Sequence, residues 1–203
     1  MTARPASQPT ALRHVLHACL GSLIAALGLF VSRGTLLPTL GAFVALALVL
    51  EALRFARPDL NGWLLGRFAP LVKTHERQAV SGATYLVLSA LLVFAVFDAR
   101  TAALAVAYTA WGDPLASVVG GRAGHWRWKG KSIEGAFVFL VGATVAGLLL
   151  ALLGANIALS ARLLGAAVAA GIEVLPIRLD DNISVPIGSA AAMTLVVALE
   201  SAA

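Results

Sequence analysis

One aspartate, Asp113, lies deep within an apolar stretch of the sequence, between Gly112 and Pro114. An acidic side chain inside a membrane-spanning segment costs about 2.5–3.5 kcal/mol on insertion scales, so it indicates a functional site by default. Gly112 has no side-chain bulk and Pro114 has no backbone donor, so we predict that the helix opens at this point. The alternative is a helix end at which Asp113 is solvated at the membrane interface. On residue type alone, we favour a functional site at Asp113 over this alternative.

A basic, glycine-rich segment, GGRAGHWRWKGKS, follows at residues 120–132. Its four glycines allow the backbone to approach a ligand closely, and its four cations offer countercharge to phosphate groups. The segment ends where the next apolar stretch begins, and a helix N-terminus favours anions. The glycine spacing is not that of a P-loop. The alternative is a cationic loop at the membrane interface. The candidate nucleotide-binding residues are Gly120, Gly121, Arg122, Arg127, Lys129, Lys131, Ser132 and Glu134, with Lys131 also a catalytic candidate.

A second acidic group, Asp180, Asp181 and Asn182, stands in the string LPIRLDDNISVP. Adjacent carboxylates and an amide are hard oxygen ligands of the kind that Mg²⁺ takes, usually shared with substrate phosphates. The alternative is a turn and helix cap, with Ser184 as the N-cap. We therefore consider these three residues candidate Mg²⁺ ligands.

Four further charged residues are candidates for the same site: Glu51, Arg54, Arg77 and Glu173. Glu51 and Arg54 are three residues apart and therefore share a helix face. Glu173 closes an apolar stretch shortly before the acidic group, so either Glu173 or Asp181 could accept a proton from a substrate. No Cys/His metal-binding spacing occurs, and we expect the four histidines to be structural or interfacial.

The elements that position these residues are membrane-spanning helices. Of 203 residues, 60% are hydrophobic and 12% are charged, and the mean hydropathy is +0.89, which a soluble domain does not match. Prolines interrupt the second, fourth and last apolar stretches. We predict an all-α, polytopic bundle of about seven transmembrane helices, a single domain over residues 1–203 with a polar leader at 1–12. The stretches expected to cross the membrane are 15–31, 36–53, 79–97, 101–119, 133–153, 158–176 and 185–203.

Basic residues fall mostly on one side of such a bundle. If seven helices alternate, twelve of the fifteen Lys and Arg residues lie on the side of the N-terminus. Arg33 and Arg100 lie on the other side, and Arg162 lies inside the sixth stretch. The positive-inside rule then predicts a cytoplasmic N-terminus in a multi-pass protein of the cell membrane. The candidate acids lie near the same face, so the active site is expected to face the cytoplasm. Orientation also explains the net charge of +5 without a nucleic-acid partner.

Several strings occur in one order along most of the chain. They are Arg13-His14 with His17 and Gly21, EALRFARPDLN, ERQAVSGATY, GDPLASVVGGRAGHWRWKGKSIEG and EVLPIRLDDNISVP. In order and spacing these strings resemble the polyprenol (dolichol), phytol and diacylglycerol kinase family, and the last string is especially similar to phytol kinases. That family is related to the phosphatidate cytidylyltransferases.

The resemblance implies a membrane-embedded enzyme that transfers the γ-phosphate of CTP, with Mg²⁺, to the hydroxyl of a lipid alcohol from the bilayer. For such an enzyme we expect Asp113 to hold Mg²⁺ together with Asp180, Asp181 and Asn182, and Asp113, Lys131 and Asp181 to act in catalysis. Two alternatives stay open at this point. A CTP-dependent phosphatidate cytidylyltransferase would attack the α-phosphate instead, and a small-molecule transporter would spread its acids along a path across the membrane. The acceptor (phytol, a polyprenol or diacylglycerol), the preference for CTP over ATP and the oligomeric state are left open.

Overall fold

The computed structural model describes residues 11–72, 74–128, 130–177 and 179–202. Over these residues the chain is helical apart from loops and one short antiparallel hairpin of strands β1 (Arg127–Trp128) and β2 (Lys131–Ser132). Two short 3₁₀ helices, η1 (Ala69–Leu71) and η2 (Thr74–Arg77), connect α3 to α4. The α-helices are α1 (Ala11–Phe30), α2 (Arg33–Ala56), α3 (Pro58–Arg67), α4 (Gly82–Val96), α5 (Ala99–Ala123), α6 (Ile133–Leu152), α7 (Leu159–Val174) and α8 (Asp181–Ala202).

Five of the described helices, α1, α2, α5, α6 and α8, are long and apolar enough to cross a membrane. Helix α4 is also apolar but has 15 residues, and α7 has 16. Each of the seven apolar stretches coincides with one of these helices. An all-α bundle of the membrane type is therefore confirmed, whereas seven spans and a cytoplasmic N-terminus stay predictions.

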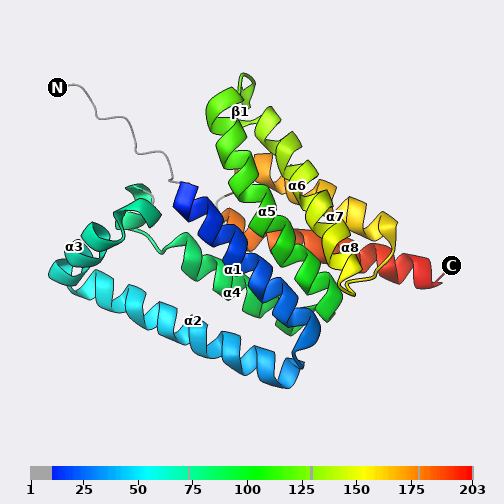
Figure 1. The fold of residues 1–203 in the computed structure, drawn as a ribbon, viewed down its shortest axis with the longest axis horizontal. Coiled ribbons are helices and arrows are strands. Elements are labelled where there is room, and N and C mark those ends of the chain that lie inside the picture. The colour runs from blue at the N-terminus through cyan, green and yellow to red at the C-terminus, as the bar shows by residue number, and fades with distance from the viewer. Residues whose placement is uncertain (1–10, 73, 129, 178, 203) are drawn as a thin grey trace.

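Helix α5 is the centre of the bundle and contacts α1, α4, α6, α7 and α8 (Figure 1). Its residues 101–110 are buried on every side, and five of these ten residues are alanine. Short side chains let neighbouring helices approach closely, which is the main way in which helices associate within lipid. Because the first half of α5 is packed tightly between other helices, it positions the second half of the helix, which carries Asp113.

Helix α5 runs without a break through Gly112, Asp113 and Pro114, so the predicted opening at this point is wrong. A side chain at Gly112 would meet the ring of Phe139 on α6 at 2.5 Å. The glycine therefore admits an aromatic ring from the neighbouring helix and does not loosen the backbone. Proline is tolerated within a packed membrane helix because surrounding groups compensate for the lost hydrogen bond. The prolines expected to interrupt α2 and α8 also lie inside continuous helices.

Capping side chains decide where several helices begin. Ser81, Asp98 and Ser132 each accept a backbone N–H from the first turn of α4, α5 and α6 respectively. Before α8, Asp180 Oδ1 accepts the backbone N–H of Asn182 at 2.9 Å. The helix consequently starts at Asp181, and the predicted cap at Ser184 is wrong.

The two ends of the bundle differ. The start of α1, helix α3 and the β-hairpin lie toward one end, whereas the turn between α1 and α2 and the C-terminal end of α8 lie toward the other (Figure 1). Helix α2 lies on the outside and packs mainly on α4. The polar candidate residues gather at the end that carries the hairpin.

Candidate functional site

A cavity of about 300 Å³ lies where the C-terminal half of α5 meets the hairpin, the start of α6, the end of α7 and the start of α8. The three residues predicted to be catalytic, Asp113, Lys131 and Asp181, all line it. Glu173 and Arg127 add two further charges to its wall. The remaining lining residues are mostly small: Ala116, Ser117, Gly120, Gly121, Gly130, Ser132, Gly135, Ala136 and Val174. The result is a charged pocket with little side-chain bulk in its walls.

Lys131 joins two carboxylates within this cavity. Its Nζ donates to Asp181 Oδ2 at 2.5 Å and lies 3.2 Å from Glu173 Oε1. Burial lowers the pKa of Lys131, but the attraction of Glu173 and Asp181 outweighs it, so the pKa lies above its usual range. Lys131 is therefore an ammonium ion at neutral pH and balances one of the two facing carboxylates.

Asp113 lies opposite the N-terminal helix. Its Oδ2 is 4.0 Å from His17 Nε2 on α1, and 24% of the Asp113 side chain is exposed. The expectation that the histidines are structural or interfacial did not connect His17 with Asp113. The available signal was the position of His17 one helical turn after Arg13, in the first of the strings that carry the family resemblance. Helix α1 therefore contributes to the surroundings of Asp113.

The hairpin forms one rim of the cavity. Gly130 has φ +91°, in the left-handed region that favours glycine, so the tight turn depends on this residue. Arg127 Nη2 donates to the carbonyl of Gly120 at 3.2 Å. A side chain at Gly120 would lie 2.6 Å from Ser132 Oγ, so only glycine lets the hairpin lie this close to α5. Lys129, also predicted to bind nucleotide, lies outside the described residues.

Three predicted residues have other positions. Arg122 is exposed on the last turn of α5 and does not line the cavity. Glu134 Oε1 accepts two backbone N–H groups of the loop before β1, at 3.0 and 3.1 Å, so this carboxylate holds the loop in place. Asp180 Oδ1 is engaged by the backbone and side-chain nitrogens of Asn182, at 2.9 and 2.8 Å. For Asp180 the contacts favour a helix cap, the alternative reading of its motif.

The oxygen donors that line the cavity and are available for a metal ion are the carboxylates of Asp113 and Asp181. Asn182, also predicted to bind Mg²⁺, is 5% exposed and does not line the cavity, and its side-chain amide donates to Asp180 Oδ1. Mg²⁺ is usually bound by one or two carboxylates together with substrate phosphates, which fits this set of donors. Within the described ranges, no group of three or more His, Cys, Asp or Glu side chains is placed to hold a metal ion. A metal ion here would therefore share its ligands with a bound nucleotide.

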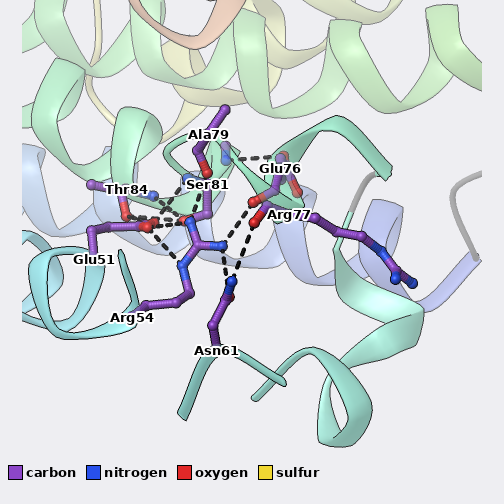
Figure 2. Close-up of polar contacts among 9 residues, drawn as sticks. Glu51, Arg54, Asn61, Glu76, Arg77, Ala79, Ser81 and Thr84 are labelled. Carbon is purple, nitrogen blue, oxygen red and sulfur yellow. Dashed lines mark hydrogen bonds and ion pairs between the residues drawn. The ribbon is translucent and has the colours of Figure 1, made fainter. Parts of the chain in front are cut away.

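Glu51 and Arg54 belong to a different polar cluster, at the end of α2 (Figure 2). The Arg54 guanidinium forms an ion pair with the Glu51 carboxylate. It also donates to the carbonyls of Glu76 at 2.8 Å and Ala79 at 2.6 Å, and to Asn61 Oδ1 at 3.4 Å. Arg54 thus uses its donors to hold the loop that precedes α4.

The Glu51 carboxylate completes the same cluster from the other side. Its Oε1 accepts from Ser81 N at 2.8 Å and from Thr84 Oγ1 at 3.1 Å. Both Glu51 and Arg54 have side chains about one-tenth exposed, and both are saturated with partners. We define this ion pair and its partners as the α2–α4 clasp, because it fastens the peripheral helix α2 to the start of α4.

Two more residues lie beside this clasp. The side chain of Arg77 is exposed and points away from the cluster (Figure 2). Glu76, which sequence reasoning missed, accepts from Gly82 N at 3.0 Å and from Arg13 Nη2 at 3.3 Å. The signal for Glu76 was its place in the string ERQAVSGATY. Through Arg13, the clasp is connected to α1.

The geometry therefore brings together two cationic and three acidic side chains from distant parts of the sequence, and it separates them from the α2–α4 clasp. Comparison of the chain with known protein families, with curated proteins and with solved structures finds no match in any of the three.

Proposed function

We propose that the chain is a membrane-embedded kinase that transfers the γ-phosphate of CTP to the hydroxyl of a lipid alcohol, with Mg²⁺. The observation that carries the proposal is the meeting of Asp113, Lys131 and Asp181 at one cavity edged by Gly120 and Gly121. Phosphoryl transfer depends mainly on positioning and on neutralising phosphate charge, and these residue types supply both.

Each of these residues has a role in the proposed reaction. Lys131 and Arg127 neutralise negative charge on the β- and γ-phosphates, while Gly121, which has no atom of the described residues within 4 Å of a side-chain position, leaves space for the chain of phosphates. Asp113 and Asp181 hold Mg²⁺, which when bound neutralises the phosphates and orients the γ-phosphate. In the absence of nucleotide, the ammonium of Lys131 reduces the electrostatic repulsion between the carboxylates of Glu173 and Asp181.

A lipid alcohol is the acceptor that explains a kinase built of apolar helices. The cavity lies among helices of membrane-spanning type, so an acceptor can reach it sideways from the bilayer. The excess of basic residues near the hairpin end supports a multi-pass protein of the cell membrane with this cavity at the cytoplasmic face. Phytol, a polyprenol and diacylglycerol are the acceptor classes to be compared.

A transporter receives less support from the same features. The buried residues 101–110 of α5 contain no acidic or basic side chain apart from the phenol of Tyr108, whose hydroxyl donates to the Arg162 carbonyl at 2.9 Å. Charged groups instead gather in the cavity at one end of α5. A path for a polar solute would need such groups along the length of the bundle.

The experiment uses the purified full chain in lipid nanodiscs, incubated with Mg²⁺, a panel of lipid alcohols and CTP labelled at either the γ- or the α-phosphate. Transfer of γ-label to lipid, absent in Asp113→Asn, is the expected result. Incorporation of the α-label with phosphatidate would establish the cytidylyltransferase instead. Absence of label from every lipid, with CTP or ATP, would overturn the proposal.

A further inference from the structure

Glu173 and Asp181 share one lysine but occupy opposite ends of two helices. Glu173 lies in the last turn of α7, and Asp181 is the first residue of α8. The partial charge of a helix is positive at its N-terminus and negative at its C-terminus. The helix ends therefore favour the negative charge of Asp181 and oppose that of Glu173.

Hydrogen bonding separates the two carboxylates in the same direction. Asp181 Oδ2 receives Lys131 Nζ at 2.5 Å, whereas Glu173 Oε1 lies farther from that nitrogen, at 3.2 Å. Glu173 Oε2 is buried and has no hydrogen-bond partner among the described residues. A buried carboxylate oxygen without a donor is costly unless it binds a proton or a donor supplied by a ligand.

We propose that Glu173 is the residue that accepts the proton of the substrate hydroxyl; this inference rests on the proposed kinase function. The O–H bond of the alcohol breaks as its proton passes to the Glu173 carboxylate. The alcohol oxygen forms a bond to the γ-phosphorus, and the bond from that phosphorus to the β–γ bridging oxygen breaks. The nucleoside diphosphate leaves with the electron pair, so atoms and charge balance without another reactant.

The same geometry assigns different roles to the other two carboxylates of the cavity, those of Asp113 and Asp181. Asp181 is engaged by Lys131 Nζ at 2.5 Å at the N-terminus of α8, while Asp113 lies against α1 near His17. Two carboxylates whose surroundings differ in this way differ in proton affinity, and the one with less stabilisation of its negative charge, Glu173, is the better proton acceptor. Neither sequence position alone nor charge distinguishes Glu173 from Asp181, but the two helix ends do.

The test measures γ-label transfer by the full chain and by Glu173→Gln, Glu173→Ala and Asp181→Ala, with Asp59→Asn on the exposed face of α3 as the matched control. Loss of a general base lowers kcat by about 10²–10⁴-fold, so Glu173→Gln should show a loss of this size with an unchanged KM for CTP. Added formate, a small carboxylate, should restore part of kcat in Glu173→Ala and none in Asp181→Ala. A structural role would not give this rescue.

Three results would overturn the assignment. Glu173→Gln could keep kcat within about tenfold of the wild type, below the usual effect of a general base. Formate could rescue Asp181→Ala and leave Glu173→Ala unchanged. Either result removes Glu173 as the base while transfer by the wild type still supports the kinase function. A wild-type chain that transfers no γ-label to lipid overturns the kinase function and the role of Glu173 together.

Discussion

Lys131 Nζ lies 2.5 Å from Asp181 Oδ2, which joins the hairpin before α6 to the first residue of α8, fifty positions later in the chain. Both residues line the cavity together with the C-terminal half of α5. It also places a cation between two carboxylates that would otherwise repel each other. The pairing of the hairpin with α8 therefore creates both the shape and the charge balance of the candidate site.

Replacement of Lys131 by Met should remove the positive charge that balances Glu173 and Asp181 and should lower the catalytic efficiency with CTP. Because Glu173 and Asp181 would then face the phosphates unpaired, kcat/KM for CTP should fall by about a hundredfold or more. Steady-state kinetics with γ-labelled CTP measures the loss. Arg67→Met, on the exposed end of α3, removes the same charge away from the cavity and should leave kcat/KM unchanged. Equal kinetics for the two variants would contradict the role of Lys131.

Asp113→Asn should abolish transfer while the bundle stays intact. The amide has the size of the carboxylate but lacks its charge, so a loss of at least about 10²-fold is expected for a group that holds phosphate charge in place through a metal ion. The same sample should show the circular dichroism and the thermal unfolding temperature of the wild type, because the α5 backbone does not depend on this charge. Retained transfer in a folded D113N protein would exclude Asp113 from the chemistry.

The helices could be predicted from the sequence because apolar stretches of about 20 residues leave the backbone no partner in lipid except itself. Their ends could not be predicted as closely. The fourth stretch, predicted as 101–119, is a helix from Ala99 to Ala123, because Asp98 caps it three residues before the predicted stretch begins. Hydropathy detects the apolar part of a helix, whereas a polar cap lies outside it.

Side-chain contacts explain where sequence reasoning about the site succeeded and failed. Charge and glycine content directed attention to Asp113, Lys131 and Asp181, and these three line one cavity. The same criteria also selected Glu51 and Arg54, whose charges are paired with each other and hydrogen-bonded within the α2–α4 clasp. Nothing in linear spacing distinguishes a carboxylate that faces a cavity from one that is saturated by backbone groups some thirty residues away.

Breaking the α2–α4 clasp should lower stability and spare the chemistry. Arg54→Ala leaves the buried Glu51 carboxylate without its ion pair and two carbonyls without donors, a change that costs about 3–5 kcal/mol for a buried pair. Thermal unfolding followed by tryptophan fluorescence measures the effect. Arg57→Ala, one turn further along and exposed, should stay within about 0.5 kcal/mol of the wild type. An R54A protein as stable as R57A would show that the clasp does not hold α2.

Membrane orientation can be measured with single cysteines, because Cys19 is the one cysteine of the chain and can be replaced by Ala. Cysteines at Ser32 and Asn156 should react with a membrane-impermeant maleimide on intact cells. Those at Asp59 and His125 should react only after permeabilisation. These four positions are exposed in turns or on the short helix α3. Labelling of all four in intact cells, or the reverse pattern, would contradict the positive-inside assignment.

The contact between Gly112 and Phe139 should control how α5 and α6 pack, and its removal can be followed separately from the chemistry of the neighbouring Asp113. A methyl group at position 112 would lie 2.5 Å from the Phe139 ring, so Gly112→Ala should destabilise the fold by about 1–3 kcal/mol, as overpacking does. Gly41→Ala is the matched control, since no atom of the described residues lies within 4 Å of a side chain there, and alanine is favoured over glycine inside a helix by about 0.5–1 kcal/mol. The two glycine variants should therefore shift the unfolding temperature in opposite directions.

Replacing the aromatic ring by the smaller side chain in Phe139→Leu should relieve the strain of G112A. The double variant should therefore be more stable than the sum of the single effects indicates. Additive effects would mean that the two residues do not share this contact and that Gly112 is required for another reason.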